Sequence, residues 1–202
     1  MEIKYICVKN DGYVDCRSEF YSASDTLDSE NEYEFTIGIN KLFGEIDSHI
    51  WAISYYLSMY KYRPKDFVLY KPLEVVVNDI TLPLNEVLTY TCYMDKIYPL
   101  FSTKKSVRKL ITQGIKKNKL TCTPEEVKDL FYLDDQRFER PVKYVGNERF
   151  RAKAAIGYAH GKQVYCFPWL SKKRFDYYHG NITILLEILE SLGKIVIVPV
   201  GE

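Results

Sequence analysis

The chain has 202 residues, enough to bury a core of its own as one domain or as one domain with a subdomain. Hydrophobic residues make up 47% of the chain, charged residues 27%, and the net charge is +1. This balance excludes an intrinsically disordered chain, gives no sign of a basic nucleic-acid surface, and predicts no nucleic-acid partner. Since no run of about twenty apolar residues occurs, we expect no direct membrane insertion.

The cysteines and histidines give no metal-ligand pattern. The five cysteines are scattered without C-x-x-C spacing, and the first residues do not have the pattern of a signal peptide, so we expect free thiols and a cytoplasmic protein. The histidines have no ligand spacing with the cysteines, and we predict no metal site. The residues concerned are Cys7, Cys16, Cys92, Cys122, Cys166, His49, His160 and His179.

The N-terminal part of the chain is rich in strand patterns. Residues 3–8 predict a strand, and a turn at residues 10–12 leads to a second strand around residues 13–21. A polar loop is expected over residues 22–31. Residues 32–43 then supply further strands, broken at Gly38, and deliver the chain to Gly44. A helix is predicted over residues 48–60, followed by short buried strands at 67–70 and 74–77.

The middle of the chain changes to helical patterns, over residues 85–95, 102–118 and 123–132. The third pattern opens with Thr123 as N-cap, Pro124 at the first helical position, and acids in the first turn. Three helices with no strand between them predict a helical subdomain at about residues 85–140, inserted into an α/β body. The whole chain, residues 1–202, is expected to form one domain.

The C-terminal part returns to alternating elements. We predict a helix over residues 147–160 closed by Gly161, a strand over 163–167, a helix over 181–192 closed by Gly193, and a final strand over 194–198. Strands alternating with helices at this spacing predict a mainly parallel sheet with right-handed crossovers.

The order of these elements resembles the ATPase domain of the ATP-binding cassette (ABC) transporter family. The shared features are a strand-rich start, a loop before a helix, a helical insert, a glycine-started helix, a strand, and a last helix and strand. The resemblance covers nearly the full chain, and it rests on order and spacing rather than on any single motif. It implies an α/β, P-loop NTPase-like fold, with a mainly parallel sheet, an N-terminal antiparallel β part and an inserted helical subdomain.

The family's phosphate-binding loop (Walker A), G-x-x-G-x-G-K-[ST], is similar in outline to GEIDSHIW at residues 44–51. Gly44 stands at the first glycine, Asp47 and His49 at the other two, Ile50 at the lysine and Trp51 at the Mg²⁺ ligand. Each lost charge-assisted contact costs roughly 1.5–3 kcal/mol, so we predict no ordinary Mg-ATP binding. The remaining nucleotide-binding positions of the degenerate motif are Glu45 and Ser48. An ordinary strand-to-helix turn capped by Asp47 or Ser48 explains the same residues.

Two further family positions have lost their chemistry. Where the family has Asp-Glu after a buried strand (Walker B), this chain has Pro168 and Trp169, which hold neither a magnesium-bound water nor an attacking one. The position of the family's switch histidine falls near Val200, and no histidine is present there. The glutamine-bearing loop falls near Asn78, the nearest polar analogue.

The signature motif, [LI]-S-G-G-[QE]-x-x-R, is better preserved. Gly146, Glu148 and Arg151 fit it, and Asn147 replaces its second glycine. Together with Arg149 these form the signature-like site, which in the family reaches across a dimer to the partner's nucleotide. Alternatively, Gly146 or Asn147 caps an ordinary helix, with Glu148 and Arg151 on its solvated face.

Two basic clusters, residues 116–119 and 171–174, fit solvated helix ends or loops better than a nucleic-acid site.

The resemblance implies a degenerate, non-hydrolytic ABC ATP-binding subunit that acts as a regulatory or structural partner. Its expected partners are a transmembrane permease, a competent ATPase subunit, or a second copy, which would hold it at the inner face of a membrane. We expect no catalytic residue and no cofactor. The alternatives are a divergent active ATPase that uses ATP and Mg²⁺ to drive transport, and a stand-alone interaction module on the same fold.

Overall fold

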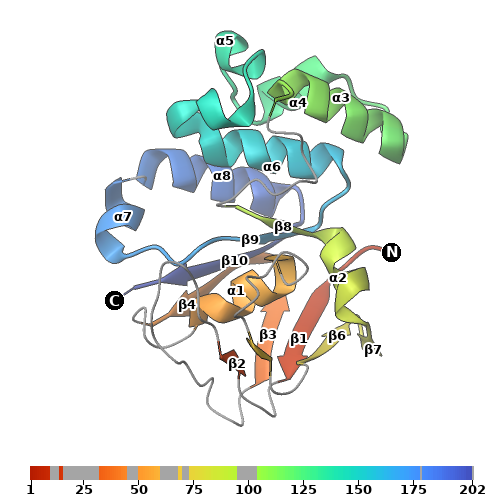
Figure 1. Ribbon diagram of the computed structural model, residues 1–202, viewed down its shortest axis with the longest axis vertical. Coiled ribbons are helices and arrows are strands. Elements are labelled where there is room, and N and C mark those ends of the chain that lie inside the picture. The colour runs from red at the N-terminus through yellow and green to blue at the C-terminus, as the bar shows by residue number, and fades with distance from the viewer. Residues whose placement is uncertain are drawn as a thin grey trace.

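The computed structural model describes residues 1–9, 14–15, 32–44, 50–59, 68–69, 73–94, 104–177 and 179–201 (Figure 1). In chain order the elements are β1 (Tyr5–Lys9), β2 (Val14–Asp15), β3 (Glu32–Thr36), β4 (Gly38–Phe43), α1 (Ile50–Met59), β5 (Val68–Leu69), β6 (Glu74–Val77), β7 (Ile80–Thr81), α2 (Leu84–Tyr90), β8 (Thr91–Tyr93), α3 (Val107–Asn118), α4 (Pro124–Leu130), α5 (Asp135–Phe138), the 3₁₀ turns η3 (Val142–Tyr144) and η4 (Gly146–Glu148), α6 (Arg149–Ala159), β9 (Val164–Cys166), α7 (Lys172–Tyr177), α8 (His179–Ser191) and β10 (Ile195–Val200). The predicted α/β fold, with a parallel sheet and an antiparallel part, is confirmed.

An antiparallel sheet has the strand order β3-β1-β6-β7. In its central strand β1, Ile6 and Val8 point into the core, whereas Lys9 points to solvent and forms an ion pair with Glu32 of β3 at 3.4 Å. Cys7 between Ile6 and Val8 is buried as well, so the polar face of this strand is limited to its ends. Strands β2 and β5 form a separate two-stranded pair. The rest of the predicted second strand and the loop at residues 22–31 lie outside the described residues.

A parallel sheet with the order β4-β10-β9-β8 forms the centre of the molecule. Strand β10 is buried along its whole length, because it has neighbours on both edges and side chains packed on both faces. A continuous apolar run such as IVIV is typical of such a strand. Gly38, which begins β4 with φ +105°, makes the bend from one sheet to the other.

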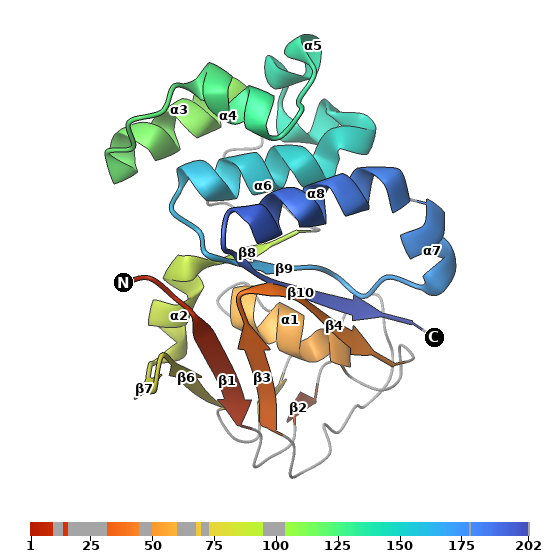
Figure 2. The same ribbon diagram turned by 180° about the vertical axis from the view of Figure 1, so that it is seen from behind.

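Helix α1 lies between the two sheets, and α6 and α8 cover the other face of the parallel sheet (Figures 1 and 2). One apolar cluster therefore joins Ile53 and Leu57 of α1 to both sheets, with Ile197 of β10 among its members. The second cluster joins Val198, on the opposite face of β10, to α6 and α8. The result is a layered α/β arrangement with two cores that share the parallel sheet.

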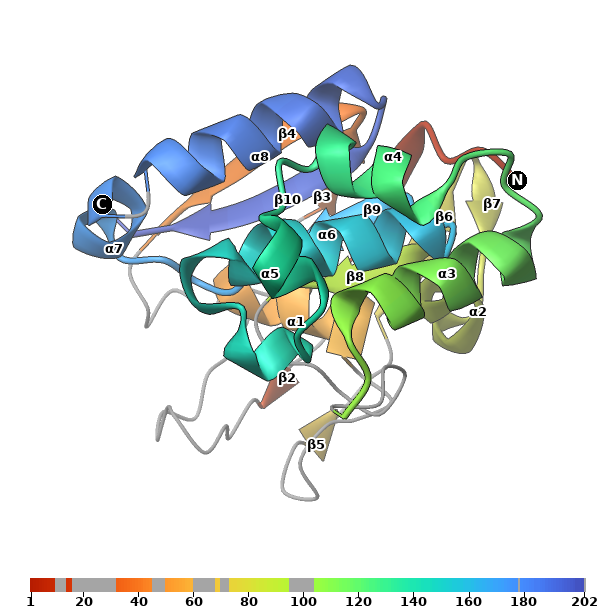
Figure 3. The same ribbon diagram turned by 90° about the horizontal axis from the view of Figure 1, so that it is seen from above.

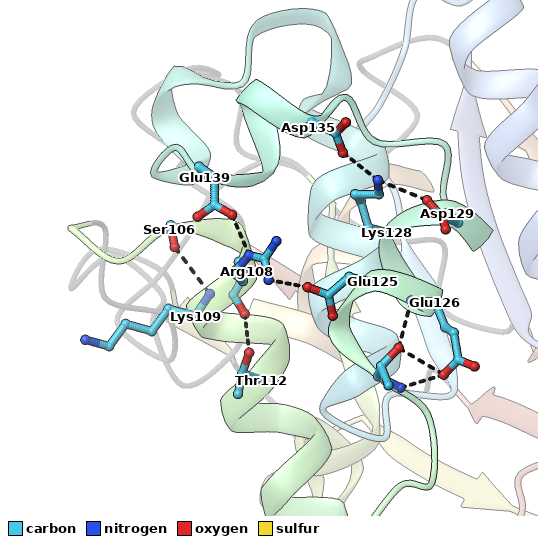
Figure 4. A network of polar contacts seen from close by, with 11 residues as sticks. Ser106, Arg108, Lys109, Thr112, Glu125, Glu126, Lys128, Asp129, Asp135 and Glu139 are labelled. Carbon is cyan, nitrogen blue, oxygen red and sulfur yellow. Dashed lines mark hydrogen bonds and ion pairs between the residues drawn. The ribbon is translucent and has the colours of Figure 1, made fainter.

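Helices α3, α4 and α5 form an outer layer over α6 (Figures 1 and 3). Thr123 caps α4 as predicted, since its Oγ1 accepts from the Glu126 N–H at 3.2 Å and the Glu126 side chain accepts from the Thr123 N–H at 2.7 Å. Arg108 of α3 pairs with Glu125 and with Glu139, which ties the three helices together (Figure 4). The subdomain boundaries at about residues 85–140 stay a prediction.

The prediction of three helices with no strand between them is wrong, because β8 follows α2 directly. Its ends are fixed by the Gln163 N–H, which donates to Tyr90 O at 2.8 Å, and by the Met94 N–H, which donates to Cys166 O at 2.9 Å. Pairing with β9 therefore prevails over the helical pattern that the sequence shows up to residue 95. Within the described residues, no helix has the length and hydrophobicity that a bilayer crossing requires.

Candidate functional site

The carboxyl ends of β4, β10 and β9 meet at one edge of the parallel sheet, and the chain leaves β4 toward α1 on one face and β9 toward α8 on the other (Figure 1). Open α/β sheets bind ligands at such an edge. The Gly44 N–H, just beyond β4, donates to Val200 O at 3.1 Å, and the Gly201 N–H donates to Leu170 O at 2.9 Å. The structure thus brings together three sites predicted from the sequence. They are Gly44 at the start of the Walker A-like loop, Pro168 and Trp169 at the Walker B-like positions, and Val200 at the switch-histidine position.

Trp169 spans this edge. Its Nε1–H donates to the carbonyl oxygen of Gly44 at 3.0 Å, so the residue after β9 is bonded to the residue after β4. Its ring lies against Gly201, where a Cβ atom would come within 2.7 Å of the indole. Three loop ends therefore share one aromatic side chain, which covers the end of the central strand β10.

A buried hydrogen-bond chain fixes α1 against the same edge. The Ser54 hydroxyl of α1 donates to the carbonyl oxygen of Phe167 at 2.7 Å, and the Ser58 hydroxyl donates to Ser54 O at 2.6 Å. The Phe167 ring packs on Phe150 of α6 with centroids 5.8 Å apart. The chain from Phe167 to Trp169 is thus held from both faces of the sheet.

Much of the Walker A-like loop lies outside the described residues. This holds for Glu45, Asp47, Ser48 and His49. Residues 50 and 51 begin α1, which confirms a helix after the loop, but the structure does not describe their side chains. The chemistry assigned to these positions stays a prediction.

The signature-like segment begins at Gly146, whose φ of +60° starts the turn η4, and it leads into α6 at Arg149. Gly146, Asn147 and Arg149 are exposed, whereas Glu148 is only 6% exposed.

Glu148 is at the centre of an ion-pair network. Its carboxylate lies 3.0 Å from Arg137 Nη1 and 3.4 Å from Arg151 Nη2, and it accepts from the Asp134 N–H at 3.1 Å. Arg151 in turn donates to Tyr132 O at 2.8 Å. The alternative that placed Glu148 and Arg151 on a solvated helix face is therefore wrong, because both bind α6 to the α4–α5 connection.

Asn78 does not occupy a glutamine-loop position. It lies in the turn between β6 and β7, and its Oδ1 accepts from the N–H groups of Lys4 and Tyr5 at 2.9 and 3.2 Å. Its Nδ2 donates to Glu2 O at 2.6 Å. The segment that leaves the parallel sheet toward the helices starts after Met94, in residues 95–103, outside the described part of the chain.

Strands β1 and β3 bring Cys7 close to Glu32 and Glu34, with atoms that could ligate a metal within 4.8 Å of one another, a group that the sequence patterns do not predict. Both carboxylates already have partners, since Tyr5 Oη donates to Glu34 at 2.9 Å and Lys9 pairs with Glu32. The hydrogen bond to Glu34 raises the Tyr5 pKa above its ordinary value. Cross-strand register, which the sequence does not state, creates this group.

Solved structures show what this arrangement is similar to. An ABC transporter ATP-binding protein from Pyrococcus furiosus superposes with a TM-score of 0.61 at 16% identity, over 98% of this chain and 92% of that one. CbiO1 from Clostridium perfringens, part of the ABC transporter complex CbiONQ, superposes with a TM-score of 0.63 at 8% identity, over 100% of this chain and 80% of that one. This chain has an ABC ATPase fold. A dimeric ATP-binding cassette in a post-hydrolysis state with ADP and phosphate superposes with a TM-score of 0.62 at 12% identity, over 98% of this chain and 88% of that one. No protein-family model matches the sequence, and neither does any curated protein.

The ABC-type fold agrees with the order of the parallel strands. The strand before the Walker A-like loop, β4, is separated from the strand before the Walker B-like position, β9, by β10 alone. Gly44 after β4 and Trp169 after β9 therefore lie on opposite sides of one strand, and the side chain of Trp169 bridges them.

Proposed function

We propose that this protein is a non-hydrolytic ABC-type subunit that acts as a structural or regulatory partner of a permease or of a competent ATPase. The observation that carries the proposal is the hydrogen bond from Trp169 to Gly44. It supports the proposal because the resemblance assigns the acidic side chains of a hydrolytic site to the position of this indole.

The residues at this edge do not fit Mg-ATP. Mg²⁺ needs oxygen ligands in octahedral geometry, and the two positions after β9 offer a proline ring and an indole N–H that already has an acceptor. The carbonyl oxygen of Gly44 is bonded, and the ring of Trp169 packs on Gly201. The lysine position of the loop is Ile50, which carries no charge for a phosphate. We therefore expect no bound nucleotide and derive no hydrolytic step.

A partner accounts for the retention of the fold. Of the similar structures, one is part of a transporter complex and another is a dimer. In the proposed complex the exposed residues Gly146, Asn147 and Arg149 at the start of α6 face a competent ATPase subunit, held in position by the buried Glu148. The site of hydrolysis then belongs to the partner.

Calorimetric titration of the full chain with Mg-ATP, together with a phosphate-release assay, tests the absence of catalysis. We expect no saturable heat up to millimolar nucleotide and no phosphate release. Micromolar binding with turnover by the isolated chain refutes the proposal and supports the divergent active ATPase.

Purification of the tagged chain from its native cells tests the partner. We expect a stable complex containing either a polytopic membrane protein or an ATPase with an intact G-x-x-G-x-G-K-[ST] loop, whose ATPase rate changes when this chain is removed. A monodisperse monomer with no such partner contradicts the proposal. In the variant Asn147→Asp, a charge is added at the exposed start of α6, and we expect the complex to weaken while the isolated chain stays folded.

A further inference from the structure

Helix α3 carries a concentration of positive charge in a chain that is nearly neutral overall. The net charge of the protein is +1, yet residues 96–124 contain no aspartate or glutamate. Helix α3 forms an outer edge of the molecule, away from the parallel sheet (Figures 1 and 3). The positive charge of α3 therefore lies at this outer edge.

The lysines of α3 form a row along its solvent-exposed face. Lys109 and Lys116 are exposed and seven positions apart, so they lie on the same face and about 10 Å apart along the axis. Thr112 and Gln113 between them are exposed and uncharged. Lys105 Nζ donates to Gln113 Oε1 at 3.1 Å, which brings a third ammonium group to the same face. We call Lys105, Lys109 and Lys116 the lysine row.

The neighbouring acids do not neutralise the lysine row. Glu125 and Glu139 both pair with Arg108, on the flank of α3 that faces α4 and α5 (Figure 4). The side chain of Lys109 extends away from this network in the same view. Within the described part of the chain, no carboxylate forms an ion pair with any member of the row.

The positive field continues to the end of α3. Lys117 in the last turn and Lys119 at the C-cap are exposed. Burial is the main cause of the lowered pKa values of His160 and Lys162, and the charge of Lys117 lowers both further. The charge of Lys117 therefore reaches the residues just after α6.

We propose that the lysine row binds an anionic lipid surface. Lysine ammonium groups are flexible, strongly hydrated point charges, which suit a diffuse negative layer, and each is worth roughly five-fold in membrane binding. Protein interfaces are depleted in lysine, whereas nucleic-acid sites use arginine forks and stacked aromatic rings. The row contains neither, since Arg108 is occupied by its two carboxylates. The contact is electrostatic and peripheral, and it requires no insertion.

Co-sedimentation of the full chain with vesicles tests this proposal, without nucleotide or partner. We expect binding to phosphatidylcholine vesicles that contain 30% phosphatidylglycerol, no binding to pure phosphatidylcholine, and release at 0.5 M salt. The triple variant Lys105→Gln, Lys109→Gln, Lys116→Gln is expected to bind roughly a hundred-fold more weakly. The matched control is Lys172→Gln with Lys173→Gln, two exposed lysines of α7, which is expected to bind like the wild type.

Several results would overturn the proposal. The first is a wild-type chain that does not bind anionic vesicles, or that binds neutral vesicles equally well. The second is a loss of vesicle binding that is as large in the control variant as in the triple variant. A single-stranded RNA of about 20 nucleotides serves as a competitor, and tight RNA binding without vesicle binding assigns the lysine row to nucleic acid instead. Lys109 and Lys116 are exposed and Lys105 is half-buried, so unchanged melting temperatures of the variants check that folding is not the cause. The outcome is independent of whether the chain hydrolyses ATP.

Discussion

Replacing Glu148 with alanine removes the centre of the network at the start of α6. Arg151, whose side chain is 12% exposed, then keeps a nearly buried charge without its carboxylate, and the Asp134 N–H loses its acceptor. Breaking one partner of a buried ion pair costs about 3–5 kcal/mol. Since the Arg137 side chain is 35% exposed and recovers hydration, we expect the lower end, about 3 kcal/mol.

For a chain of this size, that loss lowers the melting temperature by roughly 6–12 °C. Urea unfolding followed by far-UV circular dichroism measures the free energy directly. Glu148→Gln keeps an acceptor for the Asp134 N–H, and we expect it to lose less than the alanine variant. As a control, Glu125→Ala removes an exposed partner of Arg108 and should cost at most about 1 kcal/mol. A Glu148→Ala variant within about 0.5 kcal/mol of the wild type would refute the structural role assigned to this residue.

Three further predictions concern packing, pH and capping. Gly201→Ala places a methyl group 2.7 Å from the ring of Trp169, so we expect a loss of about 1–3 kcal/mol in urea unfolding, whereas Gly180→Ala, with no atom within 4 Å, serves as control. Burial lowers the pKa of His160 in the folded chain. The contribution of this histidine to stability is therefore complete above the ordinary histidine pKa of about 6.5 and is lost as the pH falls below it. Urea unfolding at pH 8 and at pH 5 measures the difference. Thr123→Ala removes the N-cap of α4 and should cost about 1 kcal/mol in thermal unfolding.

Each of these predictions has a result that contradicts it. Equal stability of the Gly201→Ala and Gly180→Ala variants would mean that the indole moves freely. The His160→Gln variant should lose part of the pH dependence between pH 8 and 5, and an unchanged profile would assign it to other groups. The exposed Thr121 provides the control for Thr123, and Thr121→Ala should leave the melting temperature unchanged.

The sequence predicts the elements whose residues carry local signals. The N-cap at Thr123, the glycine break at Gly38 and the apolar run of β10 all appear where the patterns predict them. These features depend on contacts within a few residues or on the burial of a whole strand. Both leave a pattern that can be recognised in a single sequence. The order of the resulting elements was enough to indicate the fold.

The features that the sequence misses depend on distant partners. Strand β8 was predicted as the end of a helix, because only pairing with β9, some seventy residues later, distinguishes the two. The burial of Glu148 follows from Arg137 and Arg151 meeting it in space. Similarly, the sequence alone predicts that Trp169 stands at the Walker B-like position, but its bond to Gly44 requires the sheet order.

The central position of β10 has a consequence for folding. Gly38 of β4 pairs with Ile195 of β10, so these two neighbouring strands of the parallel sheet are separated by most of the chain. Such non-local pairing is slow, and β4 and β9 have no common neighbour until β10 has been synthesised. We expect a chain truncated before Ile195 to leave two apolar strands with open edges, and ribosome-bound intermediates of this length to need protection from aggregation.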